Sequence, residues 1–273
     1  MQQKIAFLLF LLITLTTGLF AQNNNCDSAL FNKGRECLER KSFDSAIAIF
    51  NKVLEKCPTF TTAYANRGMC YLYKKEEKNA KLDFERTLAV AKTKYKMAMF
   101  IGYTYFRFEK YEDAYEYFNR ATTFKAMEAE PYFLMARSLW LARIPVLMEK
   151  YKGDYLQDPE YKSHLKKDIL VLLDRATRLD SATTYEYFYY KGMFHSNFED
   201  WQEALTCYQR SIDIHPTIAA YKYCAECCRA LKQNQKACDY IHQWAGMYSP
   251  DEGMDAFQKQ DYARKFCTEV GIP

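Results

Sequence analysis

The residues with the clearest capacity for chemistry are cysteine and histidine side chains in the last quarter of the sequence. Cys224-x2-Cys227 is followed by Cys238-x3-His242. A C-x2-C pair with a later C-x3-H pair is typical of a zinc site, because thiolate and imidazole are ligands that Zn²⁺ prefers. The alternative is structural, since cysteine also behaves as a small buried hydrophobic residue.

Outside this group, no catalytic motif is found. The sequence contains no G-x-S-x-G, H-E-x-x-H, Walker A or dinucleotide-binding pattern. The histidines are scattered, at His164, His195, His215 and His242, and no pair of carboxylates stands out by its spacing. We therefore predict a protein that is not an enzyme and that uses no cofactor.

Ten cysteines make disulfide bonds plausible if the chain is exported. Cys26 precedes the first expected helix and Cys57 ends its antiparallel partner, so both would lie at one end of a helical hairpin. Closing that loop of about 30 residues would stabilise the fold by roughly 3–4 kcal/mol. Cys238 and Cys267 would likewise join a closing helix to the last hairpin. Free buried thiols are the alternative for both pairs.

We expect helices to position the cysteine and histidine residues, because a spacing typical of paired helices recurs along the chain. Glycines at positions 34, 68 and 102 have a constant spacing of 34 residues. Twelve residues after each lies an alanine, and four residues later an aromatic residue. The sets are Gly34, Ala46 and Phe50; Gly68, Ala80 and Phe84; Gly102, Ala114 and Phe118; and, further along, Gly192, Ala204 and Tyr208. A glycine inside a helix costs about 0.5–1 kcal/mol relative to alanine. Its recurrence at one phase indicates close approach of a second helix, with the alanine as its counterpart and the aromatic ring beside it.

This pattern resembles the tetratricopeptide repeat (TPR), a pair of antiparallel helices with the motif W-x2-L-G-x2-Y…A-x3-F…P. The resemblance implies an all-α fold, a right-handed superhelix of about six repeats over residues 26–247. The third repeat is expected at about 95–126, an insertion near 144–164, and a capping helix (Met254–Val270) within 251–273. His195 takes an aromatic position of its repeat, so we expect it in the core. Ala225 and Ala237 keep the twelve-residue offset, which favours buried cysteines beside them, and we predict no metal site.

In proteins of this family, positions on the first helix of each repeat line a concave face. Here those positions hold Phe31, Arg35, Met69, Tyr73, Tyr103, Phe106, Arg107, Phe133, Arg137, Trp140 and Tyr189. Aromatic residues, methionine and arginine are enriched at protein interfaces. The resemblance therefore implies a groove for a protein or peptide. The alternative is that packing buries several of these side chains. A carboxylate clamp known in one branch of the family is not expected, because Phe31, Arg35 and Phe100 depart from it.

Residues 1–21, MQQKIAFLLFLLITLTTGLFA, have the organisation of a secretory signal peptide: a lysine, an apolar run, and small residues before Ala21. We therefore expect an exported protein, periplasmic or secreted, without a membrane segment after cleavage. A retained anchor is the alternative. The formal charge is +4, from 38 basic and 34 acidic residues. This balance does not favour nucleic acid as a partner.

Together these patterns predict an exported, non-catalytic TPR scaffold that binds a protein or peptide in an aromatic and arginine-lined groove. A glycan-binding or small-ligand-binding protein of the cell envelope is the alternative, because tyrosine and tryptophan faces also suit sugars. A fold alone does not fix a function.

Overall fold

In the computed structural model of the chain, residues 28–150, 159–247 and 253–272 are described, without the side chains of 144–162 and 164. The predicted signal peptide and Cys26 lie outside these residues. The described residues form α-helices and contain no strand. They divide into two compact units, of which the first ends at Phe124 and the second begins at Lys125. Among the described helices, none has both the length and the hydropathy needed to cross a membrane.

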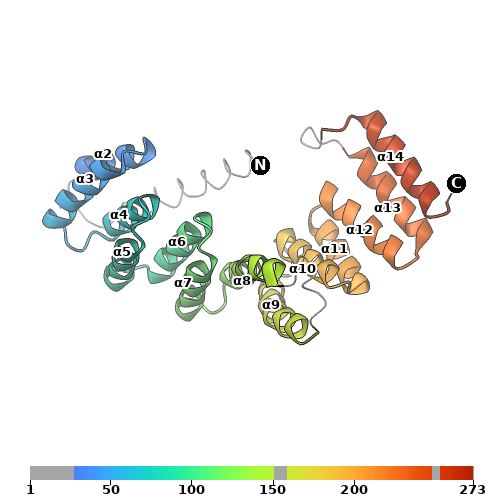
Figure 1. Cartoon of the computed structure of the whole chain (residues 1–273), viewed down its shortest axis with the longest axis horizontal. Coiled ribbons are helices and arrows are strands. Elements are labelled where there is room, and N and C mark those ends of the chain that lie inside the picture. The colour runs from blue at the N-terminus through green and yellow to red at the C-terminus, as the bar shows by residue number, and fades with distance from the viewer. Residues whose placement is uncertain (1–27, 151–158, 248–252, 273) are drawn as a thin grey trace. The chain divides into compact units, whose positions relative to one another are not determined.

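Unit 1 consists of three helical hairpins (Figure 1). Its helices are α2 (Ser28–Glu39), α3 (Phe43–Lys56), α4 (Thr61–Tyr73), α5 (Glu77–Val90), α6 (Lys94–Arg107) and α7 (Tyr111–Phe124). The pairs α2/α3, α4/α5 and α6/α7 pack against each other along their lengths. Each pair buries the apolar stripe that neither helix could bury alone.

In every hairpin of unit 1, the glycine of the first helix lies against an aromatic ring of the second. A Cβ atom added at the glycine would lie 2.7, 2.7 and 2.6 Å from the ring Cε1 in the pairs Gly34–Phe50, Gly68–Phe84 and Gly102–Phe118. Carbon atoms need about 3.5–4.0 Å for optimal contact, so a β-carbon could be accommodated only if the ring moved. The ring, and not the expected alanine, is therefore the closest neighbour of each glycine.

The hairpins turn through a residue with positive φ, which is 59° at Lys41, 61° at Lys75 and 58° at Glu109. Around Lys75, its own N–H donates to the Leu72 carbonyl at 2.9 Å, and the Glu76 N–H donates to the Tyr71 carbonyl at 2.9 Å. These two bonds are the Schellman arrangement that ends many helices. Unit 2 uses positive φ at two equivalent turns, at Glu199 and Lys232.

Unit 2 contains two long helices, two hairpins and a closing helix. They are α8 (Ala129–Lys150), α9 (Pro159–Leu179), α10 (Tyr185–Asn197), α11 (Trp201–Ile214), α12 (Ile218–Ala230), α13 (Asn234–Gly246) and α14 (Ala256–Glu269). The expected insertion at 144–164 falls on the end of α8, on 151–158 outside the described residues, and on the start of α9. Helix α8 thus extends to Lys150, into the segment expected as an insertion, and α9 begins at Pro159.

The hairpins of unit 2 are filled in two ways. In α10/α11, a Cβ added at Gly192 would lie 2.9 Å from the ring of Tyr208, as in unit 1. In α12/α13, Ala225 takes the glycine position and Ile241 takes the ring position, and both are fully buried together with Ala237. A disulfide between Cys238 and Cys267 joins α13 to α14. The same core contains Trp244 and Phe266.

Candidate functional site

The predicted groove residues separate into buried and accessible side chains. Phe31, Met69 and Phe133 have only 1, 8 and 7% of their surface exposed. The prediction that these three line an open groove is wrong, because packing within their own unit covers them. The Phe31 ring, for example, lies 5.7 and 4.9 Å from the rings of Phe50 and Phe60.

An accessible cluster in unit 1 is centred on Tyr73, which is 38% exposed. Its ring stacks on Phe43 at a centroid distance of 4.6 Å and meets Phe108 edge-on at 4.7 Å. The guanidinium Nη2 of the exposed Arg107 lies 3.4 Å from the Tyr73 hydroxyl, a long hydrogen bond. We refer to Phe43, Tyr73, Arg107 and Phe108 as the Tyr73 surface.

The repeat places these residues together. Tyr73 is the last residue of α4, and Arg107, 34 residues later, is the last residue of α6. Phe43 is the first residue of α3. The residues of the Tyr73 surface therefore lie next to the turns that join the two helices of each hairpin. Arg107 has no ion-pair partner among the residues that the structure describes. The surface therefore combines an accessible ring with an uncompensated positive charge.

The other predicted groove residues of unit 1 are half-buried. Arg35 lies 3.5 Å from Glu39 in an ion pair. On α6, Tyr103 and Phe106 pack edge-on against Phe118 and Tyr111, at centroid distances of 5.5 and 5.3 Å. Each of these side chains retains some accessible area, although packing determines its orientation.

In unit 2, the predicted residues Arg137, Trp140 and Tyr189 are also half-buried. The Arg137 guanidinium lies 4.7 Å from the Tyr190 ring centroid, a cation–π contact. Trp140 packs edge-on against Phe194 at 5.4 Å, and Tyr189 lies 6.0 Å from Tyr223. These contacts join α8, α10 and α12, so the three side chains help to hold unit 2 together.

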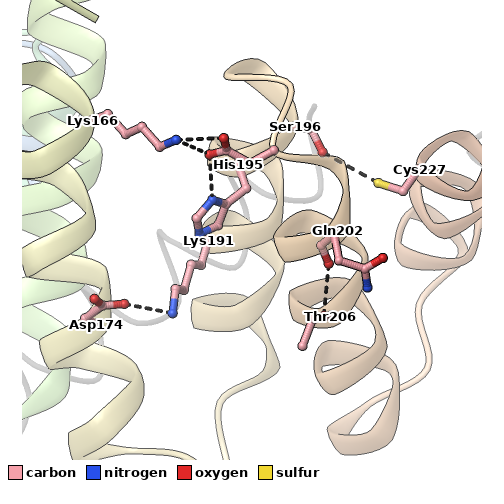
Figure 2. Close-up of polar contacts among 9 residues, drawn as sticks. Lys166, Asp174, Lys191, His195, Ser196, Gln202, Thr206 and Cys227 are labelled. Atoms are coloured by element: carbon pink, nitrogen blue, oxygen red, sulfur yellow. Dashed lines mark hydrogen bonds and ion pairs between the residues drawn. The ribbon is translucent and has the colours of Figure 1, made fainter. Parts of the chain in front are cut away.

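A polar cluster that the sequence analysis did not predict joins α9, α10 and the start of α11 (Figure 2). Lys166 Nζ lies 2.7 and 2.5 Å from the two carboxylate oxygens of Asp200. His195 Nδ1 lies 3.0 Å from Asp200 Oδ2. A carboxylate only accepts hydrogen bonds, so Nδ1 carries the hydrogen. His195 is 7% exposed, which confirms its predicted place in the core.

Neighbouring side chains stabilise the ionised form of the Asp200 carboxylate. Partial burial alone would raise the pKa of Asp200, but hydrogen bonds from Lys166 and His195 outweigh it, and the pKa lies below its ordinary value. A second ion pair, Lys191 with Asp174 at 2.7 Å, joins α10 to α9 (Figure 2). With its hydrogen-bonding groups paired internally, the cluster is a structural connection between helices.

A hollow of about 430 Å³ lies on α11, α12 and α13 of unit 2. It is lined by Gln209, Ile212, Asp213, Tyr221, Lys236, Asp239, Tyr240 and Gln243. The side-chain amide of Gln209 donates to the Tyr240 hydroxyl at 2.9 Å. Small-molecule sites commonly have about 300–1,000 Å³. The repeat pattern did not predict this hollow, because none of its lining residues takes a first-helix position that lines the concave face.

The structure also decides between the alternatives for several cysteines. Cys238 and Cys267 form a disulfide, whereas Cys224 and Cys227 are buried thiols. Burial raises the pKa of Cys227 to about 11. A disulfide sulfur carries no thiolate charge, so the zinc-like set of the sequence does not supply four ligands in this state. Cys57 is disulfide-bonded, and Cys26, its predicted partner, lies outside the described residues.

Comparisons with known proteins agree with this fold. Residues 95–126, expected as the third repeat, match the family described as Tetratricopeptide repeat. No curated protein matches the sequence.

Similar solved structures include the MamA protein, with a TM-score of 0.52 and 18% identity over 75% of this chain and 94% of that chain. The C-terminal part of a TPR repeat-containing protein from Cytophaga hutchinsonii has a TM-score of 0.56 and 15% identity over 88% and 95%. Pseudomonas aeruginosa pilF has a TM-score of 0.50 and 14% identity over 87% and 96%. The chain thus contains a tetratricopeptide repeat at residues 95–126 and has the all-α solenoid fold of these proteins.

Proposed function

We propose that the protein is an exported, non-catalytic scaffold that binds a protein or peptide partner. The repeat at 95–126 and the solenoid fold support a scaffold. The signal-like sequence at 1–21 and the Cys238–Cys267 disulfide support export to the periplasm or beyond, where such bonds persist. The observation that carries the binding proposal is the Tyr73 surface, where an exposed ring and an arginine lie side by side.

The chemistry of this surface fits a segment with an acidic and an apolar side chain. The Arg107 guanidinium would receive the carboxylate, because its planar donors match that group in a bidentate arrangement. Its present bond to the Tyr73 hydroxyl is long, at 3.4 Å, and would be replaced at little cost. The Tyr73 ring offers a large rigid contact area. Tyrosine and arginine are enriched among the few interface residues whose truncation costs about 2 kcal/mol or more.

Site-specific crosslinking tests this proposal. A photoreactive phenylalanine analogue would replace Tyr73 in the full chain, and Leu82, which is 55% exposed on α5, in a matched control. In the cells that produce the protein, we expect a defined product from position 73 and none of the same mass from position 82. Adding Arg107→Glu should remove the product while leaving the circular dichroism spectrum unchanged. Identical products from both positions, or a product that survives Arg107→Glu, would contradict the proposal.

A second candidate function is binding of a sugar or another small polar ligand, which the hollow on α11–α13 favours. Two tyrosine rings, two aspartates and amide groups line it, and these suit stacking and hydrogen bonding to hydroxyls. A glycan panel tested with the wild type, Tyr240→Ala and Tyr73→Ala would separate the two functions. Binding lost only in Tyr240→Ala would favour the hollow. The absence of any bound glycan would remove this candidate.

A further inference from the structure

Three side chains that bind soft metals meet where α13 and α14 pack together. Cys238 and His242 lie one turn apart on α13, and positions i and i+4 share a helix face. Cys267 on α14 is bonded to Cys238, with a Cα–Cα distance of 5.1 Å. Its Sγ lies 3.5 Å from Nε2 of His242. All three potential ligand atoms lie within 4.8 Å of one another.

These distances are close to those of a tetrahedral zinc site. Zn–S bonds of about 2.3 Å and Zn–N bonds of about 2.0–2.1 Å place a sulfur about 3.6 Å from a nitrogen, and two sulfurs about 3.8 Å apart. The separation of 3.5 Å between Cys267 Sγ and His242 Nε2 already meets the first requirement. The two sulfur atoms, which the disulfide holds together, would have to separate, and Cys238 Sγ, now within 4.8 Å of the His242 ligand atom, would have to lie about 3.6 Å from it. Reduction of that bond removes this restraint.

We propose that reduction of the Cys238–Cys267 disulfide converts this cluster into a Zn²⁺ site with Cys238, His242 and Cys267 as its ligands. A dithiol reductant supplies two electrons and two protons, so that the S–S bond breaks, two thiols form and the reductant becomes a disulfide. Zn²⁺ then displaces the two thiol protons, because the thiolate is the ligand. The exposed position of His242 leaves room for water as the fourth ligand.

The neighbouring thiols are less suited to this role. Cys224, Cys227 and Cys228 on α12 are 0, 1 and 0% exposed. None belongs to the group of residues whose ligand atoms lie within mutual reach. The Zn²⁺ site would keep α14 joined to α13 after the covalent bond is lost.

Metal titration of the full chain tests this inference. The protein would be reduced with dithiothreitol, desalted without oxygen and titrated with Zn²⁺ against a chromophoric chelator, in parallel with the oxidised protein. We expect one tightly bound Zn²⁺ in the reduced chain and none in the oxidised chain. Cys267→Ser should abolish tight binding, whereas the control Cys227→Ser should retain it. Equal binding by both redox forms, or by Cys267→Ser, would overturn the proposal.

His242→Ala provides a test that does not depend on the sulfur atoms. The side chain is exposed and the variant keeps the disulfide, so its oxidised form should have the unfolding temperature of the wild type. In the reduced state, loss of this ligand should weaken Zn²⁺ binding at least about tenfold. Zn²⁺ should also raise the unfolding temperature of the reduced wild type more than that of the reduced variant. Unchanged affinity in His242→Ala would exclude histidine as a ligand and the site as proposed.

Discussion

The hairpin α6/α7 of unit 1 and the hairpin α12/α13 of unit 2 have similar helices but different interiors. In α6/α7, the fully buried ring of Phe118 lies against Gly102. In α12/α13, Ala225 replaces the glycine and the aliphatic side chain of Ile241 replaces the ring, and a disulfide joins the hairpin to α14. One backbone arrangement is therefore compatible with two interiors: a glycine against an aromatic ring in unit 1, and an alanine with an aliphatic side chain in unit 2, where a covalent bond also joins the hairpin to the next helix.

The largest expected effect comes from removing the ring in unit 1. Phe118→Ala should lower the free energy of unfolding by about 3–5 kcal/mol, because it deletes a fully buried aromatic side chain. All three tryptophans, Trp140, Trp201 and Trp244, belong to unit 2. Denaturant unfolding followed by circular dichroism should therefore shift more than unfolding followed by tryptophan fluorescence. A loss below about 1 kcal/mol would contradict the assigned role of the ring.

The matching change in unit 2 is removal of the covalent bond. In zinc-free buffer, the double variant Cys238→Ala/Cys267→Ala should have a free energy of unfolding about 3–4 kcal/mol lower than the wild type, because the disulfide closes a loop between cysteines 29 residues apart. Fluorescence should detect this loss, because Trp244 contacts Tyr262 of α14 at 5.3 Å. Cys37→Ala, which removes a half-buried free thiol in unit 1, is the control. Equal shifts in the two variants would mean that the bond is not what stabilises this region.

A smaller effect is expected from filling the space that a glycine leaves. Gly102→Ala places a Cβ 2.6 Å from the ring of Phe118, and such overpacking costs about 1–3 kcal/mol. The higher helix propensity of alanine stabilises by at most about 1 kcal/mol, so the substitution should lower the free energy of unfolding overall. Gly246→Ala on α13 meets nothing within 4 Å and should stabilise slightly. Thermal unfolding of both variants tests this difference. An unfolding temperature above that of the wild type in both variants would contradict the role assigned to Gly102.

The sequence predicted the regular part of this molecule well for a physical reason. A hairpin that repeats one contact must repeat its residues, so the spacing of Gly34, Gly68 and Gly102 predicted the hairpins of unit 1. The pattern did not reveal which side chain lies nearest each glycine. Side-chain direction depends on rotamers, and these are decided by the packed neighbours.

The candidate sites were predicted less completely. A first-helix position does not fix exposure, because rings from neighbouring helices cover Phe31 while Tyr73 stays accessible at a turn. The contact between Lys166 and Asp200 could have been predicted from the sequence, because the two residues are 34 positions apart, which is one repeat length. The hollow on α11–α13 had no such signal, because its side chains come from positions that share no motif.

The Asp200 cluster predicts a pH dependence within unit 2. A carboxylate whose pKa is lower in the folded state stabilises the fold above its unfolded pKa of about 3.9, and this contribution is lost as the pH falls through the folded value. Asp200→Asn should therefore destabilise by about 1 kcal/mol at neutral pH, since the site is partly exposed. The difference from the wild type should shrink as the pH falls below about 4. A constant difference across that range would exclude the carboxylate charge as its cause.

The smallest expected effect tests what the two regions share. Lys75 in unit 1 and Lys232 in unit 2 both adopt positive φ, at 61° and 57°, in the turn that closes their hairpins. A side chain is strained there by about 1–2 kcal/mol, and glycine relieves it but loses about 0.5–1 kcal/mol through the greater freedom of the unfolded chain. Lys75→Gly and Lys232→Gly should each stabilise by about 0.5 kcal/mol, measured by denaturant unfolding. Because the two turns have the same geometry, opposite signs would show that the interiors of the hairpins, and not the turns alone, determine the strain.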